Sequence, residues 1–256
     1  MFSHPKLTPH PPVYSPELPN ESPILYAFPQ SKKLLTCLEI NSLKIQTLLL
    51  FTHYPFVLIE HHDPNISPDG HLPCLQVEGE LYAASDIRIE AKSRGLDIDN
   101  FLSSEEKANC VAFIALVESK LQFALDYELW YESSHFNDIT LDLRGASYPW
   151  PLNYLIPRME RQAKIKSMLA KQPVLKTQDI YGEVSIVLEQ LSLLLGDKVY
   201  FYGTRPSTLD VIVFSYLHII LSLLSQSSTE SRLKKLAQIH DNLVQYSRRV
   251  WTTWYP

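Results

Sequence analysis

The hydrophobic pattern of residues 22–100 alternates between short apolar runs and helical segments. Residues 24–28 form a short apolar run bounded by prolines, which predicts a strand. Leucine and isoleucine cover most of the surface of residues 42–51, which predicts a helix that is covered on two sides. Residues 56–59 predict a fully buried strand, because a parallel pair joined by a helical crossover produces such apolar runs.

The same region continues with a predicted hairpin and a short helix. Residues 73–77 and 80–83 flank Glu78 and Gly79, which we expect to form the turn of the hairpin. A short helix at residues 85–94 follows. Strand, helix, strand, hairpin and helix is the order of a thioredoxin-like lobe, which we therefore predict for this region.

Beyond residue 101 the hydrophobic positions recur with helical spacing. Ser103 and Glu106 form a capping box, and the helix that they begin is expected to extend to about residue 132. Further helices are predicted at residues 152–171, 177–195, 230–237 and 240–252, with an apolar helix from Ser207. Pro157 should kink the first of these helices or mark its first turn. Residues 101–256 are thus predicted to form an all-helical lobe, and the fold class is α/β plus all-α.

One stretch, residues 211–224, is apolar on every face and has to be compared with a membrane span. It is shorter than the ~20 residues that a bilayer requires, and Asp210 closes its start. We therefore interpret it as a central core helix, and we expect no other stretch to come close to a span. Membrane association is predicted to be peripheral or through partners.

The composition narrows the possible classes of function. With 7 Gly in 256 residues and no GxGxxG or GxxxxGK[ST] sequence, phosphate-binding loops are not expected. The net charge of −5 argues against a nucleic-acid partner, which requires a clustered basic face. Cys37, Cys74 and Cys110 form no disulfide framework and no CxxC pair, which is typical of a reducing compartment. Residues 1–21 are rich in proline and predict a flexible tail that faces the cytosol.

Two local motifs have a structural cause. The sequence GHLP at residues 70–73, directly before a hairpin strand, is typical of the turn of thioredoxin-like folds in which the proline peptide is cis. Ser207 and Asp210 form a capping box at the start of the apolar helix, as in the S-x-x-D box of glutathione-transferase-like proteins. Removing a capping side chain costs about 1 kcal/mol. We therefore predict structural roles for Pro73, Ser207 and Asp210.

Longer segments resemble the metaxin family. The resembling segments are SLKIQT at 42–47, PF at 55–56, SPDGHLP at 67–73, YFYG at 200–203, PSTLD at 206–210 and VF at 213–214. YPWPLN at 148–153 is similar, almost letter for letter, to a segment of the second metaxin type. The resemblance covers roughly residues 22–252, and YPWPLN is its most specific part.

The resemblance implies a glutathione-transferase-like fold and a non-enzymatic, peripheral subunit of the sorting and assembly machinery that inserts β-barrels into the mitochondrial outer membrane. The location that it implies is the cytosolic face. The implied partners are the barrel-forming assembly subunit, a second metaxin-like subunit and β-barrel precursor proteins. Precursors could be bound by strand addition to a sheet edge or by side-chain capture in a groove. Two alternatives are a glutathione-dependent transferase and a cytosolic scaffold protein with the same fold.

Catalytic chemistry has few candidates in this sequence. A transferase needs a hydroxyl or thiol just after the first strand, where Ser31 stands on a proline-led loop that is typical of a turn. Ser85 lies where the fold would bind a γ-glutamyl carboxylate, although a plain N-cap explains it equally well. His61 and His62 are neighbours, and neighbouring side chains in a strand point to opposite faces and cannot ligate one ion. We predict no catalytic residue, no cofactor and no metal.

Aromatic side chains are the candidates for partner contacts. Tyr148 and Trp150 are spaced by prolines in a rigid extended loop, and Trp251 and Trp254 lie near two arginines at the C-terminal end. Such residues are enriched at interface hot spots. Internal packing between the lobes explains them equally well, and we predict that one of the two clusters faces a partner.

Overall fold

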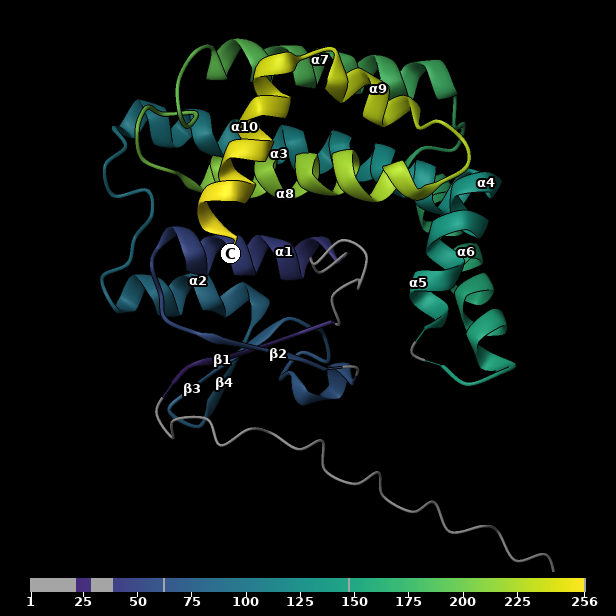
Figure 1. Cartoon of the computed structure of the whole chain (residues 1–256), viewed down its shortest axis with the longest axis horizontal. Helices are drawn as coiled ribbons and strands as arrows, with labels where there is room; N and C mark the ends of the chain where they lie inside the picture. The colour runs from purple at the N-terminus through teal and green to yellow at the C-terminus, as the bar shows by residue number, and fades with distance from the viewer. Residues whose placement is uncertain (1–21, 29–38, 62, 147, 256) are drawn as a thin grey trace, which may run out of the picture.

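The computed structural model describes residues 22–28, 39–61, 63–146 and 148–255. The proline-rich segment 1–21, the transferase candidate Ser31 and Cys37 therefore lie outside the described residues. A four-stranded sheet with two helices is followed by an all-helical lobe (Figure 1). This is the predicted fold class.

The sheet has the strand order β2-β1-β3-β4. Its strands are β1 (Ile24–Ala27), β2 (Val57–Glu60), β3 (Cys74–Val77) and β4 (Glu80–Ala83). β1 and β2 are parallel, as the helical crossover predicts, and the other pairs are antiparallel. Glu78 and Gly79 form the hairpin turn with positive φ angles of 52° and 88°. The prediction that β2 is fully buried is wrong, because β2 is an edge strand of this sheet and its residues are half-buried or exposed.

Helix α1 (Ile40–Phe51) lies between the sheet and the helical lobe (Figure 1). Its Leu49 belongs to the same apolar core as Leu25 and Leu75 of the sheet. Leu43 and Phe51 belong to the core of the helical lobe instead. Burial on both sides explains why this helix has no polar face and confirms that it is covered on two sides. Helix α2 (Ala84–Ser93) packs beside α1 and on β3 and β4.

The second lobe consists of helices packed around α8. In chain order its elements are α3 (Ser104–Asp126), η2 (Tyr127–Tyr131), α4 (Ser133–His135), η3 (Phe136–Thr140), α5 (Leu141–Gly145), α6 (Leu152–Lys171), α7 (Thr177–Leu195), α8 (Thr208–Ser222), η4 (Leu223–Gln226), α9 (Arg232–Gln238) and α10 (Asp241–Trp254). The predicted bounds of α6 and α7 are confirmed. Pro157 lies inside α6 beyond its first turn, so the alternative that it marks the first turn is wrong.

The buried cap of α8 joins three parts of the helical lobe. The carboxylate of Asp210 accepts hydrogen bonds from the amide and hydroxyl of Ser207, at 2.9 and 2.6 Å. It also accepts from the amide of Phe201 at 3.1 Å and from the hydroxyl of Tyr246 at 3.0 Å. Burial raises the pKa of Asp210 to about 6. The predicted capping box is present, and it also fixes α10 through Tyr246.

Two described stretches are long and apolar enough to cross a membrane by length and composition, Ser104–Tyr131 and Thr208–Gln226. In Thr208–Gln226, 78% of the apolar window is buried within the protein, which confirms the interpretation as a core helix. In Ser104–Tyr131 the buried share is 28%. The expectation that no second stretch comes close to a span is therefore wrong, because the apolar run at residues 110–117 raises the mean hydropathy of this helix.

Ionic and hydrogen-bonded contacts join the two lobes. The carboxylate of Asp99 accepts from the amide and hydroxyl of Thr208, at 2.8 and 2.6 Å, and pairs with Arg88 of α2 at 2.8 Å. Lys44 of α1 pairs with Glu118 of α3 at 2.7 Å. The first lobe is thus fixed both to the start of the central helix and to α3.

Candidate functional site

A hairpin of two helices, α5 and α6, projects from the helical lobe (Figure 1). The two backbones approach closely at Gly145, where a Cβ atom would lie 2.5 Å from the carbonyl oxygen of Asn153. That carbonyl has no partner amide at the usual position in its own helix, because Pro157 lacks an N–H group. Glycine at position 145 therefore permits the close packing of the hairpin.

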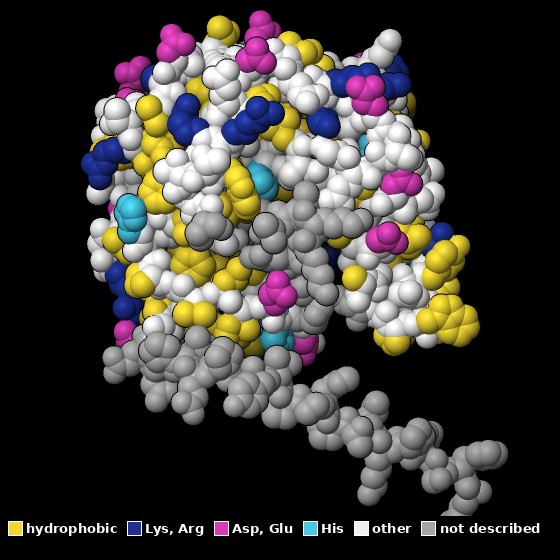
Figure 2. Space-filling view, in the orientation of Figure 1, with side chains coloured by type: hydrophobic (Ala, Val, Ile, Leu, Met, Phe, Trp, Pro, Cys, Tyr) yellow, Lys and Arg dark blue, Asp and Glu magenta, His cyan; other side chains and the backbone are white. Residues whose placement is uncertain are grey.

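The free end of this hairpin, which we call the hairpin tip, presents an exposed apolar surface. Trp150 is 84% exposed and Met159 is 69% exposed. The other exposed members of the hairpin tip are Tyr148, Leu152, Tyr154 and Leu155. Figure 2 shows apolar side chains gathered at this end of the hairpin, at the lower right of the view. An exposed apolar cluster of large side chains marks an interaction surface.

Positive charge is concentrated on the hairpin. Residues 141–171 contain six Lys or Arg and two Asp or Glu, a formal charge of +4, whereas the whole chain has −5. The guanidinium of Arg158 lies 3.3 Å from the centre of the Tyr154 ring. Arg144 donates two hydrogen bonds to Glu160, at 2.9 and 3.2 Å, and so links α5 to α6. The apolar tip is therefore bordered by arginine.

The base of the hairpin is fixed to the π-helical segment η2. The Nε and Nη2 atoms of Arg161 donate to the carbonyl oxygens of Trp130 and Tyr131, at 2.7 and 2.9 Å. Lys164 pairs with Asp126 of α3 at 3.0 Å. Arg161 thus satisfies carbonyl groups at the end of a helix, where α-helical hydrogen bonding is interrupted. These contacts hold the hairpin in one orientation on the helical lobe.

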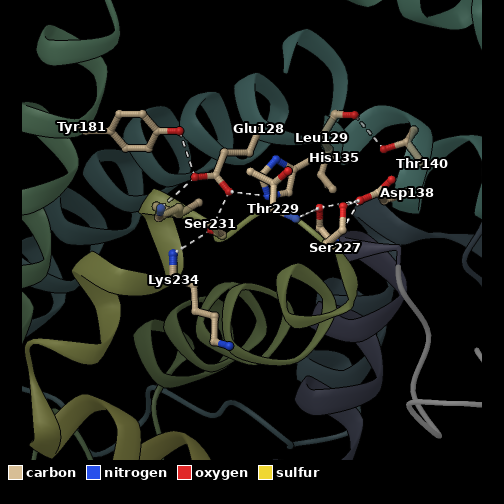
Figure 3. A network of polar contacts seen from close by, with 12 residues as sticks. Glu128, Leu129, His135, Asp138, Thr140, Tyr181, Ser227, Thr229, Ser231 and Lys234 are labelled. Carbon is tan, nitrogen blue, oxygen red and sulfur yellow. Dashed lines mark hydrogen bonds and ion pairs between the residues drawn. The ribbon is translucent and has the colours of Figure 1, made fainter. Parts of the chain in front are cut away.

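A buried polar network supports the same region (Figure 3). The carboxylate of Glu128, which is 1% exposed, accepts from the hydroxyls of Tyr181 and Ser231, at 2.8 and 2.5 Å. It also accepts from the amide of Leu233 at 2.7 Å. His135 lies beside it, with its Nε2 atom 3.8 Å from a carboxylate oxygen. Because Leu233 is in the first turn of α9, Glu128 caps that helix and ties η2 to α7 and α9.

The second aromatic cluster predicted as a partner contact lies where the lobes meet. The ring of Trp254 packs against Phe51 of α1 with 5.0 Å between centroids, and its Nε1 donates to the hydroxyl of Tyr200 at 2.9 Å. The ring of Trp251 stacks on His218 of α8 at 4.5 Å. Both tryptophans are half-buried, and an open cleft of 480 Å³ lies beside Trp254. Trp254 therefore packs between the lobes, whereas Trp251 packs within the helical lobe.

Pro73 lies directly before β3, an interior strand of the sheet, at the end of that strand where the transferase alternative would place a thiol. The Leu72–Pro73 peptide is cis, as the motif predicts. Helix α2 begins at Ala84, and the hydroxyl of Ser85 donates to Asp86 at 3.2 Å instead of accepting from a backbone amide. The interpretation of Ser85 as an N-cap is therefore wrong, because the helix starts one residue earlier than predicted.

The two described cysteines are buried, which bears on thiol chemistry. Burial raises the pKa of the Cys74 thiol, next to Pro73. Burial, followed by the nearby Asp99 carboxylate, raises the pKa of Cys110 to about 11. Thiols with raised pKa values are protonated at neutral pH and are poor nucleophiles.

The structure gives no support to the histidine neighbours as a metal site. Among the described residues no group of three or more His, Cys, Asp or Glu side chains is placed to hold a metal ion. The Nδ1 atom of His61 accepts from the amide of Asp63 at 3.2 Å within a local turn. His62 lies outside the described residues.

Sequence reasoning missed most of the residues that position the hairpin. Glu128 and Arg161 are charged residues in helical segments, and a sequence pattern does not distinguish them from solvated side chains. Gly145 carries no turn motif that would indicate a close approach to another helix. The concentration of six basic residues in 144–171 within a chain of net charge −5 is the signal that could have drawn attention to this hairpin.

Comparison with solved structures defines the class of protein by its fold. A glutathione transferase of Phanerochaete chrysosporium aligns with a TM-score of 0.62 and 15% identity, over 90% of this chain and 96% of that one. A glutathione S-transferase of Ceriporiopsis subvermispora, solved in complex with glutathione, aligns with a TM-score of 0.61 and 16% identity, over 92% and 98%. Residues 184–250 match the glutathione S-transferase C-terminal domain. The chain therefore has the glutathione-transferase-like fold.

The chain is also similar in sequence to the metaxins over most of its length. Metaxin-1 of Mus musculus is 28% identical over 232 residues, which cover 87% of this chain and 72% of the relative. Metaxin-2 of Homo sapiens is 27% identical over 233 residues, which cover 90% and 88%. Residues 42–161 match the Tom37 family of outer mitochondrial membrane transport complex proteins. The similar identities do not separate the two metaxin types.

Proposed function

We propose that this chain is a non-enzymatic, peripheral subunit of the machinery that sorts and assembles β-barrel proteins at the cytosolic face of the mitochondrial outer membrane. The observation that carries this proposal is the match of residues 42–161 to outer mitochondrial membrane transport complex proteins, within a chain that is homologous to metaxins over most of its length. Its proposed partners are the barrel-forming assembly subunit, a second metaxin-like subunit and β-barrel precursors.

We place the outward contact of this subunit at the hairpin tip. Tyr148 and Trp150 are exposed there, and residues 141–161 of the hairpin fall within the segment that matches the transport complex family. Trp251 and Trp254, by contrast, are occupied by contacts with α8 and α1. A large aromatic side chain that is exposed in the isolated chain marks a surface that contacts either a protein partner or a membrane.

Purification of the tagged chain from mitochondria in a mild detergent tests this function. We expect the barrel-forming subunit and a second metaxin-like subunit to co-elute, and carbonate extraction to release the chain from membranes as a peripheral protein. A tagged outer-membrane protein of unrelated function is the control for detergent carry-over. Recovery of the chain in the cytosolic fraction, with neither subunit in the eluate, would support the cytosolic scaffold alternative instead.

The transferase alternative is favoured by the fold and by the cis peptide before Pro73. Against it, the thiols of Cys74 and Cys110 are buried and have raised pKa values. Retention on glutathione-agarose followed by a thiol-conjugation assay distinguishes the two functions. Tight retention with turnover that Ser31→Ala abolishes would overturn the non-enzymatic proposal.

A further inference from the structure

We propose that the hairpin tip binds the surface of an anionic phospholipid bilayer. In this arrangement Trp150 and its apolar neighbours enter the interfacial layer, and Arg158 contacts lipid phosphates. The identity of the membrane, the mitochondrial outer membrane, rests on the proposed function, whereas the contact itself rests on the geometry and charge of the hairpin.

The side chains of the hairpin are ordered by their distance from its free end. Trp150, Leu152 and Leu155 are exposed at the end itself. Arg158 follows on α6, three residues after Leu155 or roughly 5 Å further along the helix axis. Elements that bind a membrane surface bury their apolar side roughly 5–10 Å into the boundary between headgroups and acyl chains. An apolar end followed by an arginine at this distance fits that boundary.

The residue types at the hairpin tip are those that the interface favours. Tryptophan and tyrosine are enriched at both membrane–water interfaces, because their rings are largely apolar and carry one polar group. Trp150 is the most exposed of the large apolar side chains in the described part of the chain, and Tyr154 lies close by with Arg158 against its ring. The contact between Arg158 and Tyr154 keeps a positive charge beside an aromatic ring, at the depth of the interface where lipid phosphates lie.

Charge and shape favour a bilayer over a protein groove as the occupant. The formal charge of +4 on the hairpin, residues 141–171, in a chain of −5, is complementary to an anionic lipid surface. The hairpin tip is the end of a projection (Figure 2), and a fluid interface can surround a convex apolar end without a matching concave surface. A protein partner would need a groove shaped to this end.

Vesicle sedimentation with the full chain tests the contact. We expect binding to phosphatidylcholine vesicles that contain about one fifth phosphatidylinositol, weaker binding to phosphatidylcholine alone, and weakening by salt. The double variant Trp150→Ala/Leu155→Ala should lower the partition coefficient by about tenfold or more, since two large apolar side chains are lost from the interface. Arg158→Gln should reduce the preference for anionic vesicles.

The matched control is Leu193→Ala, which removes a 76% exposed leucine from α7 and should leave vesicle binding unchanged. Unchanged melting of each variant shows that the fold is intact. Equal binding of the double variant and the wild type, or no binding to anionic vesicles, would overturn the proposal. A photo-crosslinker at position 150 that captures only a protein chain in intact mitochondria would also overturn it, in favour of a protein contact.

The outcomes separate this contact from the proposed function. Detergent removes the bilayer, so co-purification reports on protein partners alone. If partners co-elute but vesicle binding fails, only the membrane contact is lost. If the chain binds vesicles but no partner co-elutes, only the proposed function is contradicted.

Discussion

Gly145 determines how closely α5 can approach α6. An added Cβ atom would lie 2.5 Å from the carbonyl oxygen of Asn153, which is a backbone atom and cannot rotate away as a side chain can. Gly145→Ala should therefore lower the free energy of unfolding by about 1–3 kcal/mol. Urea unfolding followed by far-ultraviolet circular dichroism measures this loss.

Gly182 in α7 is the matched control for that substitution. No atom lies within 4 Å of a Cβ added there, and glycine is unfavourable inside a helix. Gly182→Ala should therefore raise the free energy of unfolding by about 0.5–1 kcal/mol. If both alanine variants change stability in the same direction by the same amount, the close approach at Gly145 is not what constrains that residue.

His218 should make stability sensitive to acid. Burial lowers the pKa of His218 from 6.5 to about 4, and its ring stacks on Trp251 in a cleft also lined by Lys234 and Arg248. Between these two pKa values the unfolded chain binds more protons, so the contribution of His218 is fully present above pH 6.5 and is lost as pH falls towards 4. The loss amounts to at most about 3 kcal/mol.

The variant His218→Phe keeps a stacked ring but cannot titrate. Urea unfolding of both proteins from pH 7 to pH 4 should show a smaller loss of stability for the variant. Other groups, including Asp210, titrate in both proteins, so the difference between the two curves isolates His218. Parallel curves for both proteins would show that His218 is protonated equally in the folded and unfolded chains.

Local sequence could predict residue roles only where both partners are close in the chain. The capping boxes of Ser103 with Glu106 and of Ser207 with Asp210 each join residues three positions apart, and both were predicted. Glu128 and the amide of Leu233 are 105 positions apart in the chain. Contacts at that separation depend on the packing of helices, which a single sequence does not specify.

The cap of α8 should contribute more to the free energy of unfolding than the cap of α3. Asp210→Asn replaces one acceptor oxygen by an amide, although four donors point at the carboxylate in a fully buried site. At least one donor then loses its acceptor, and we expect a loss on the order of 2–4 kcal/mol. Thermal and urea unfolding measure it.

The exposed capping box of α3 provides the comparison. Glu106 accepts from the amide of Ser103 at 2.8 Å in an exposed position, where water can replace a lost partner. Glu106→Gln should therefore lower the free energy of unfolding by about 1 kcal/mol or less. A loss at Glu106 as large as that at Asp210 would contradict the role assigned to burial.

The elements that periodicity predicted well are those with one continuous apolar face. Helix α7 has Ile180, Val184 and Leu191 on its buried face and Gly196 directly after its end, and both bounds were predicted. The helix from Ser103 was predicted as uninterrupted to about residue 132, but it continues as the π-helical segment η2 from Tyr127. That change coincides with the tertiary contacts of Glu128 and with the carbonyls that Arg161 binds, which local periodicity does not encode.

At the scale of the whole molecule, the seam between the lobes depends on side chains from both ends of the chain. The absence of a polar face on α1 predicted that both its sides are covered, but not which residues meet it. Trp254 fills that position by packing against Phe51 and against His53, with ring centroids 5.0 and 5.1 Å apart. Its side chain therefore contributes to the joint between α1 and α10.

Trp254→Ala should consequently destabilise the folded chain, whereas Trp150→Ala should not. Removing the indole of Trp254 removes half-buried apolar contacts with α1 and leaves the hydroxyl of Tyr200 without this donor, so we expect a loss of about 1–3 kcal/mol. Trp150 is 84% exposed, and its loss should change stability by less than about 0.5 kcal/mol. Urea unfolding, with hydrogen exchange of the amides of α1, distinguishes the two.

Hydrogen exchange of α1 in the Trp254→Ala variant also distinguishes the two roles that an aromatic residue near the C-terminal end can have. A residue that joins the lobes should, when removed, speed hydrogen exchange in α1 even in the isolated chain. A residue that binds a partner should leave exchange unchanged and lower the recovery of partners in a detergent eluate. If Trp254→Ala behaves in the second way, Trp254 faces a partner, and the half-buried contacts with α1 are not what holds the two lobes together.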